Sequence, residues 1–503
     1  MSQVRKYFQS MRPDSVANLV NASRRDFLCS SASGAGALAL LTLMHQDKAL
    51  ASSNQVPEAL THFAPKAKRC IFIFMAGAPS QIDLFDDKPE LKRLHGKKMP
   101  DSLLSKVRFA FIKKESATLM ASKRIFKKHG QSGMLFSDLL PRLGSCADDI
   151  AMIKSMHTDQ FNHHPGQLVM QCGNGEFGLP AMGSWINYGL GSENQDLPGY
   201  VVLTAGRGSS GGATLWQSGF LPSVYAGVRF RNQGAPVLNL DSPMGLSSDL
   251  QRQTLDAIRA INQSRFDLVK DPEIQSRIEN YELAFRMQMA APELTDLSAE
   301  RQSTRDLYGV DREDIETGKS TRGGSPGQFK LFAKNCLLAR RMVERGVRFV
   351  NIIHASWDHH SNLDKELTYN ATMCDRPIAG LIKDLKQRGL LDETLVVWGS
   401  EFGRTPLGEN RPGRASNTGR DHHPYAFSMF LAGGGIKGGV THGETDDIGW
   451  NPVKDPVHAN DLQATILHLF GINHEKLTYL HRGANQRLTT ITRQSKVIRN
   501  ILA

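Results

Sequence analysis

The stretch that decides the fold is "KRCIFIFMAG", residues 68–77. Its interior is apolar and it ends in Ala-Gly, which is typical of a buried strand that closes on a loop. Five further stretches share this character, and they are residues 148–157, 197–206, 347–356, 393–403 and 426–436. Because most of them are apolar throughout rather than alternating, they predict strands covered on both faces. The expected fold is α/β, a mainly parallel central sheet with helices on both faces.

Helical patterns lie between these strands. Residues 372–393 place apolar side chains at helical spacing with charged residues opposite, and residues 460–472 show a second such pattern. The charged segment from about 242 to 342 is predicted to be a helical insertion on the sheet rather than a second catalytic domain.

The first 51 residues are predicted to be an export signal. "SRRDFL" contains the pair Arg24 and Arg25, and it precedes a weakly apolar stretch and a small-residue "ALA" site. The apolar part, residues 32–44, is too short for a transmembrane anchor, which needs about 20 apolar residues. We therefore expect twin-arginine export through the translocase, a periplasmic or secreted protein, and a single mature domain over 52–503.

Composition excludes few functions. The 503 residues are 40% hydrophobic and 22% charged, which is ordinary for a folded globular protein. The net charge of +11 invites a nucleic-acid interpretation, but the basic residues occur in short runs such as "FIKKESATLMASKRIFKKHG", so solvated surface is expected and nucleic acid is not. None of the six cysteines forms a CxxC pair, which argues against a thiolate zinc site.

Polar clusters follow several of the predicted strands, at the sheet edge where ligands of open α/β sheets bind. In "SWDHHSNL", Asp358 and His360 are two residues apart in an extended loop, so both side chains can share one metal ion. Glu401 ends another strand. His422 in "GRDHHP" is the expected third ligand, with His423 as its rival. Imidazole with carboxylate favours zinc, manganese or iron over calcium.

The loop after residues 68–77 adds further acids. Asp83 is the expected ligand, Asp86 and Asp87 are alternatives, and a turn-capping role is equally compatible with the pattern. Ser80 carries a hydroxyl that can act as a nucleophile, but no base adjoins it in the sequence.

Three other residues are weak catalytic candidates. His163 and His164 stand where a turn leads into a helix, and a helix N-terminus favours an anion. Arg404 follows Glu401 and can bind phosphate or sulfate oxygens through its guanidinium fork. Pairing of Arg404 with a loop carboxylate is the alternative.

The succession "SRRDFL", "FMAGAPSQIDLFDDKP", "NHHPGQLVMQCG", "SWDHHSNL", "WGSEFGRTP" and "GRDHHPYAFSMFLAGGGIKGG" resembles the DUF1501 family. These are exported bacterial proteins of undefined activity, abundant in planctomycetes. The family in turn looks like a distant branch of the alkaline phosphatase and sulfatase superfamily. That likeness implies one or two divalent metal ions, the first held by Asp358, His360 and His422, the second by Asp83 and Glu401.

The chain also departs from those relatives. It has Glu401 and Phe402 where sulfatases place Asp-His, and it lacks the Cys-x-Pro-x-Arg motif of the formylglycine route. The resemblance therefore implies an exported metal-dependent hydrolase of phosphate or sulfate esters, acting on an anionic ester substrate. The alternative is a non-catalytic or single-metal binding protein on the same fold.

Overall fold

The computed structural model describes residues 61–503, with gaps at 105–108, 111, 115–116, 232–233, 239, 241, 243–246, 316–325 and 410–417. Residues 57–503 form one compact unit. The export signal predicted for residues 1–51 lies outside the described residues. Within the described ranges, no helix combines the length and the apolar character needed to cross a membrane.

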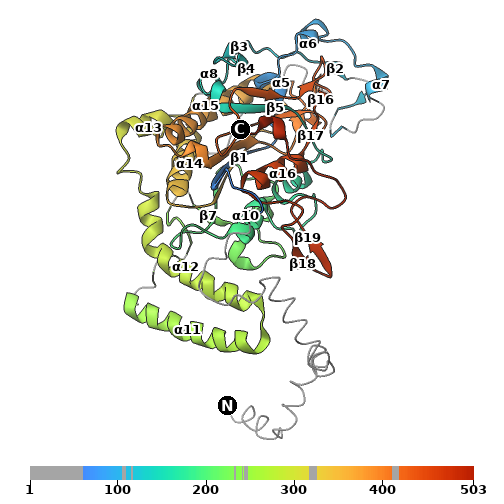
Figure 1. The fold of residues 1–503 in the computed structure, drawn as a ribbon. Coiled ribbons are helices and arrows are strands. Elements are labelled where there is room, and N and C mark those ends of the chain that lie inside the picture. Colours follow the sequence, from blue (N-terminus) through green and yellow to red (C-terminus); the bar gives the residue numbers. More distant parts are fainter. Residues whose placement is uncertain are drawn as a thin grey trace, which may run out of the picture. The chain divides into compact units, whose positions relative to one another are not determined.

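A nine-stranded sheet runs through this unit in the order β14-β5-β13-β9-β1-β8-β6-β7, with β17 also beside β5 (Figure 1). All six predicted strands belong to it, which confirms that part of the expectation. The strands are β1 (Arg69–Ala76), β5 (Ile150–His157), β6 (Tyr200–Gly206), β7 (Val228–Phe230), β8 (Phe349–Ala355), β9 (Thr394–Gly399), β13 (Phe427–Ala432), β14 (Val440–His442) and β17 (Val457–His458).

The sheet is mainly parallel, as predicted. β1 pairs in parallel with both β8 and β9, and β6 pairs in parallel with β8. β13 is antiparallel to both of its neighbours, β5 and β9. The five longer strands other than β13, namely β1, β5, β6, β8 and β9, therefore share one direction, and their carboxyl ends lie at one edge.

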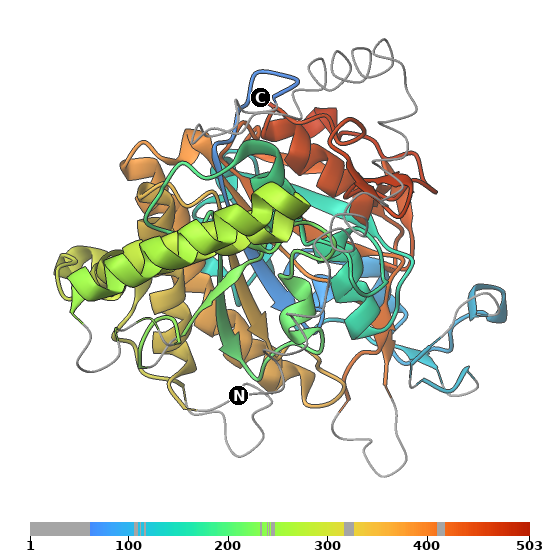
Figure 2. The same ribbon diagram turned by 90° about the horizontal axis from the view of Figure 1, so that it is seen from below.

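Helices cover both faces, which explains why β1 is apolar throughout. Alternate residues of β1 enter opposite cores, with Ile71, Ile73 and Met75 on one side and Cys70, Phe72 and Phe74 on the other. The first core includes α14 (Gln328–Glu344) and α15 (Leu363–Gln387). The second includes α9 (His163–Cys172), α10 (Met182–Leu190) and α16 (Ala459–Leu469). Figure 2 shows helices on both sides of the sheet.

Helix boundaries differ from the sequence-based expectation. α15 begins at Leu363, well before the predicted start at 372, and continues through Pro377. The segment 242–342 contains α11 (Ser248–Val269), α12 (Pro272–Thr295), α13 (Gln302–Tyr308) and most of α14. α11 packs along α12 and has no buried residue, whereas α14 packs directly on β8 and β6. Only part of this segment therefore lies away from the sheet.

The register of the sheet places the loops that carry the polar clusters at one edge. Met75 of β1 is level with His354 of β8, and Phe74 of β1 is level with Gly399 of β9, so these three strands end together. Because β13 runs the other way, its amino end lies at the same edge. The short strand β12 (His422–His423), which precedes β13, is placed there too.

Candidate metal centre

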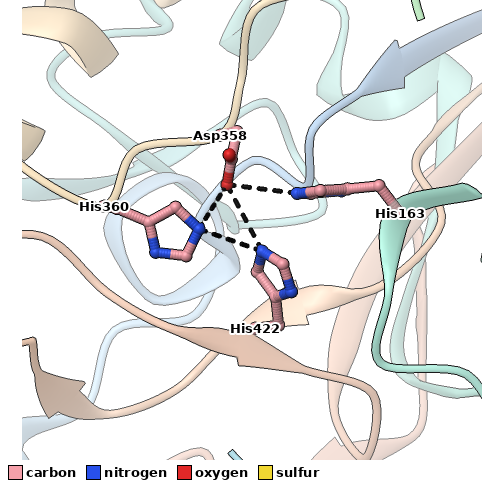
Figure 3. A group of neighbouring side chains, drawn as sticks. All are labelled: His163, Asp358, His360 and His422. Atoms are coloured by element: carbon pink, nitrogen blue, oxygen red, sulfur yellow. Dashed lines mark hydrogen bonds and ion pairs between the residues drawn. The ribbon is translucent and has the colours of Figure 1, made fainter. Parts of the chain in front are cut away.

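Four side chains converge at this edge: His163, Asp358, His360 and His422 (Figure 3). Oδ1 of Asp358 lies 2.7 Å from Nε2 of His360, 3.1 Å from Nε2 of His163 and 3.3 Å from Nε2 of His422. His163 is the first residue of α9, Asp358 and His360 are in the loop after β8, and His422 is in β12. Residues up to 259 positions apart thus meet at one carboxylate oxygen.

Each of the three imidazoles is held from behind through Nδ1. His422 Nδ1 donates to the backbone carbonyl of Phe161 at 2.8 Å. His163 Nδ1 donates to Glu401 at 2.7 Å, and His360 Nδ1 donates to Glu409 at 2.5 Å. Because carbonyl and carboxylate oxygens accept, Nδ1 carries a proton in each ring, and Nε2 of a neutral ring presents its lone pair to the cluster.

This donor set fits a divalent cation. Nε2 of His360 and Nε2 of His422 face each other at 3.0 Å, and the buried Nε2 of His163 faces Oδ1 of Asp358 at 3.1 Å. Lone pairs that point at one another and at an anionic oxygen repel unless a proton or a metal cation lies between them. Three imidazole nitrogens and one carboxylate oxygen suit zinc and related transition metals. Hydrogen bonds from the ligands' Nδ1 atoms to carboxylates are the usual support of such sites.

The protonation states agree with a ligand role. Burial would raise the pKa of Asp358, but Arg404 and the three imidazoles outweigh it and hold this pKa well below its usual range. Burial lowers the pKa of His422 to about 4, so His422 is neutral at pH 7. Burial would also lower the pKa of His163, but the carboxylates of Asp358 and Glu401 raise it to about 9, so this ring carries a second proton at pH 7, which a bound cation would replace. The cluster therefore contains an ionised carboxylate at neutral pH.

Arg404 positions Asp358 from inside the protein. Its side chain is only 1% exposed, and it donates to Oδ1 of Asp358 at 2.8 Å. Its remaining hydrogen bonds go to the backbone carbonyls of Gly77, Ala78 and Arg420. The guanidinium thus joins the ends of β1 and β8, and its fork is engaged by protein groups instead of an external anion.

Glu401, expected as a ligand, contacts the cluster through His163. Its carboxylate is fully buried, and Oε1 accepts from Nδ1 of His163, from the backbone N–H of Gly77 at 2.9 Å and from Gln167 at 3.1 Å. Ser400 also donates to Oε2 at 2.6 Å. Glu401 therefore orients His163 and lies one hydrogen bond behind the cluster.

The first-strand acid is engaged elsewhere. Asp83 forms a buried ion pair with Arg420 at 2.7 Å, and it accepts from Ser80 Oγ at 2.5 Å. Ser80 is itself 1% exposed and lies at the start of the short helix α5 (Gln81–Leu84). Asp86 binds Lys88 and Lys154, and Asp87 binds Lys92; these contacts are 2.9 to 3.4 Å long.

A second set of possible ligands shares one residue with the first. His360, Glu409 and Asp421 also lie close enough to hold an ion. Glu409, however, accepts from Nδ1 of His360, and Asp421 accepts from the backbone N–H groups of Ile112 at 3.1 Å and His422 at 2.8 Å. These contacts give both carboxylates a supporting role around the first cluster.

The neighbouring histidines point away. His359 Nε2 lies 3.0 Å from the side-chain amide of Asn370, and His423 lies 2.6 Å from the carbonyl oxygen of Trp450. Each Asp-His-His motif thus contributes its residues to opposite sides of an extended backbone, as the two-residue period requires. His164 lies beside Thr214 at 3.4 Å, outside the cluster.

Sequence reasoning missed the Nδ1 acceptors and did not group His163 with the metal ligands. One signal for His163 is present, since it begins a helix six residues after the end of β5 and so lies at the same sheet edge as the other possible ligands. Glu409 lies in an irregular loop next to residues 410–417, and Phe161 acts through its backbone, so no spacing rule identifies either.

The cluster faces an open cavity of about 440 Å³, within the range of small-molecule sites. Its other walls are Phe109, Ala110, Phe161 and Asn162. The site thus combines the cluster of possible metal ligands, the side chains of Phe109 and Phe161, and the amino end of α9.

Replacing Gly77 with alanine should displace Asp358. Gly77 has φ +113°, and an added Cβ would lie 2.6 Å from the backbone nitrogen of Asp358. We expect zinc affinity, measured by chelator competition, to fall at least about tenfold, since supporting shells of metal sites carry effects of this size. Gly389→Ala is the control, because φ there is +69° and no atom lies within 4 Å of the added Cβ. Equal affinities in the two variants would refute the packing argument.

Known proteins similar to this chain include one family. The model of a family described as "Protein of unknown function (DUF1501)" matches residues 67–502. No curated protein matches the chain.

Solved structures that match this chain include a lipoteichoic acid synthase, a sulfatase and an alkaline phosphatase. A lipoteichoic acid synthase from Listeria monocytogenes is 10% identical, and the match covers 88% of this chain and 79% of the synthase, with a TM-score of 0.35. A sulfatase from Pseudoalteromonas sp. is 12% identical over 81% and 68%, with a TM-score of 0.35. An alkaline phosphatase from the Antarctic bacterium TAB5 is 13% identical over 80% and 98%, with a TM-score of 0.33. At these scores the site is interpreted from its own geometry.

Proposed function

The chain belongs to the DUF1501 family of proteins of unknown function, and from its site we propose that it hydrolyses phosphate or sulfate esters with the help of a divalent cation. The observation that carries this proposal is the convergence of three imidazole Nε2 atoms on Asp358 at the floor of an open cavity. His163, Asp358, His360 and His422 would hold the cation. A bound cation would offset the charge of the ester group and polarise its bond to the leaving oxygen.

The residues around the cavity would orient the ester. α9 begins at the cavity, and the positive end of its dipole favours an anionic group beside Asn162 and His163. Phe109 and Phe161 would contact the apolar or ring-shaped part of the alcohol and exclude water from that side. Arg404 would keep Asp358 in place throughout.

The attacking group in this proposal is water. The described walls of the cavity contain no serine, threonine or cysteine, and Ser80 is buried against Asp83. A covalent intermediate on the protein therefore has no evident nucleophile, and direct attack on phosphorus or sulfur is the simpler route. The same observation favours the alternative, a metal-binding protein without turnover.

Export is the second part of the proposal. It rests on the paired arginines and the short apolar stretch within residues 1–51, which are read from the sequence alone.

Among the described residues, all five cysteines are buried and none forms a disulfide. Burial raises the pKa of the Cys146 thiol to about 11, so this cysteine is an inert core residue.

The test measures hydrolysis of p-nitrophenyl phosphate and p-nitrophenyl sulfate by metal-free and metal-reloaded protein. We expect turnover only after reloading with zinc, manganese or iron. His163→Ala should lower kcat/KM by about 100-fold or more, as expected for loss of a group at the reacting centre. His164→Ala, its neighbour outside the cluster, is the matched control. Metal binding without turnover on a broad ester panel would favour the binding-protein alternative.

A further inference from the structure

Almost the whole net charge of the chain lies in one stretch. Residues 88–130 contain 13 Lys and Arg against three Asp and Glu, a net charge of +10, whereas the full chain carries +11. Residues 1–51 contain six basic and three acidic residues. The rest of the chain is therefore slightly acidic, at −2, and the basic runs expected to be ordinary surface are in fact concentrated.

We name the described residues of this stretch the basic lobe; they are 88–104, 109–110, 112–114 and 117–130. The lobe includes α6 (Pro89–Arg93), α7 (Asp101–Leu104), β2 (Thr118–Leu119) and β3 (Phe126–His129), blue to cyan in Figure 1. It holds 11 basic residues against two acidic ones. Nine of the basic side chains are exposed: Lys92, Arg93, Lys97, Lys98, Lys113, Lys114, Lys123, Lys127 and Lys128.

The lobe adjoins the cavity. Phe109 forms part of the cavity wall, and the backbone N–H of Ile112 donates to Asp421, the residue before His422. At the far end, Arg124 binds Asp364 at 2.7 Å, near the start of α15 and just after the loop that carries His360. Residues of the lobe thus contact the segments on both sides of the cluster, the one that carries His422 and the one that follows His360.

Much of this charge is not neutralised by the protein. Within the described residues, Lys98, Lys114, Lys127 and Lys128 form no ion pair, whereas Lys123 shares Asp364 with Arg124. A concentration of exposed like charge destabilises the fold through self-repulsion, so an external anion that offsets it binds favourably. A single phosphate or sulfate would contact only a few of these lysines, whereas a chain of anionic groups would reach many.

The composition of the lobe favours a sugar polymer over a nucleic acid. Eight of its nine exposed basic residues are lysines, which act as point charges rather than the planar forks that stack on bases. Single-stranded nucleic acids are held on exposed aromatic side chains. In the described part of the lobe, the only large hydrophobic side chain that is mostly exposed is Ile125, at 64%.

We propose that the basic lobe binds an anionic polysaccharide, a sugar polymer that carries repeated sulfate or phosphate groups, and presents one of its esters to the cavity. The cleavage step rests on the proposed function. It would break one S–O or P–O bond, transfer the sulfuryl or phosphoryl group to the oxygen of water and leave the sugar hydroxyl with a proton from that water. Binding to the lobe needs neither the cation nor turnover.

The experiment measures binding of fluorescent dextran sulfate to the full-length mature protein over a range of salt concentrations. The lobe variant combines Lys98→Gln, Lys114→Gln, Lys127→Gln and Lys128→Gln. The control variant removes the same charge elsewhere, by Arg259→Gln, Arg265→Gln, Lys437→Gln and Lys476→Gln, all at exposed positions. Uncharged dextran and a single-stranded oligonucleotide of matched charge are the comparison ligands.

We expect the lobe variant to bind at least about tenfold more weakly, with a salt slope lower by about three, since each neutralised anionic group releases about 0.7–0.9 counterion. The control variant should bind as the unmodified protein does. Equal losses in both variants, or an oligonucleotide bound as tightly as dextran sulfate, would overturn the proposal. The lobe variant should hydrolyse aryl esters as fast as the unmodified protein. If the hydrolase proposal is wrong, the unmodified protein will show no turnover, and this result is independent of dextran sulfate binding.

Discussion

Replacing His360 with alanine is expected to lower zinc affinity by roughly 100-fold. His360 Nε2 makes the shortest contact with Asp358, at 2.7 Å, and its ring is fixed from behind by Glu409. Structural zinc binding is worth about 10–16 kcal/mol, so one of four ligands accounts for about 3 kcal/mol, which corresponds to roughly 100-fold. Competition with a chromophoric chelator measures the change.

The control for this experiment is His474→Ala. His474 is half-buried, hydrogen-bonded to Thr489 at 3.0 Å, and outside the cluster. Zinc affinity should be unchanged there. If His360→Ala and His474→Ala bind zinc equally well, the imidazoles around Asp358 are not ligands, and the cluster would have to be an internal hydrogen-bond network.

Glu409→Gln is expected to weaken zinc binding by about 10- to 100-fold, the usual effect of losing a carboxylate behind a ligating imidazole. Glutamine keeps the size of the side chain but removes the charge that strengthens the hydrogen bond from Nδ1 of His360. Glu401→Gln should have a similar effect through His163. These are positioning residues, because they act on the metal through the imidazoles.

A purely structural role for these carboxylates predicts a different pattern. It would lower the thermal stability of the metal-free protein while leaving the zinc affinity of the folded fraction intact. We expect the reverse, a weaker affinity with a smaller change in metal-free Tm. Glu444→Gln, an exposed carboxylate paired with Lys454 at 2.8 Å, is the matched control.

The sequence predicts the sheet well because a strand that is buried on both faces must consist almost entirely of apolar residues. "CIFIFM" alternates between two cores and so must be apolar at every position. Strand direction is not recorded in the same way. That β13 is antiparallel becomes visible only in the pairing, yet this direction brings His422 to the edge where β8 delivers Asp358.

The site was partly predictable for the same reason. Asp358, His360 and His422 follow or precede apolar runs, so they were expected at one edge, and the structure brings them together. The roles of Arg404 and Glu401 depend on where a side chain points after packing. Arg404 turns inward to the carbonyls of Gly77 and Ala78, and Glu401 turns toward His163, choices set by tertiary contacts rather than spacing.

The central claim, that these four residues hold a cation, is tested most directly by the metal content of the purified protein, measured by mass spectrometry after reloading and dialysis. We predict about one equivalent of zinc, manganese or iron per chain, as a site with one set of four ligands requires. In Asp358→Asn/His360→Ala the bound metal should be lost. Unmodified protein that retains no metal, or a double variant that retains as much as the unmodified chain, would contradict the account.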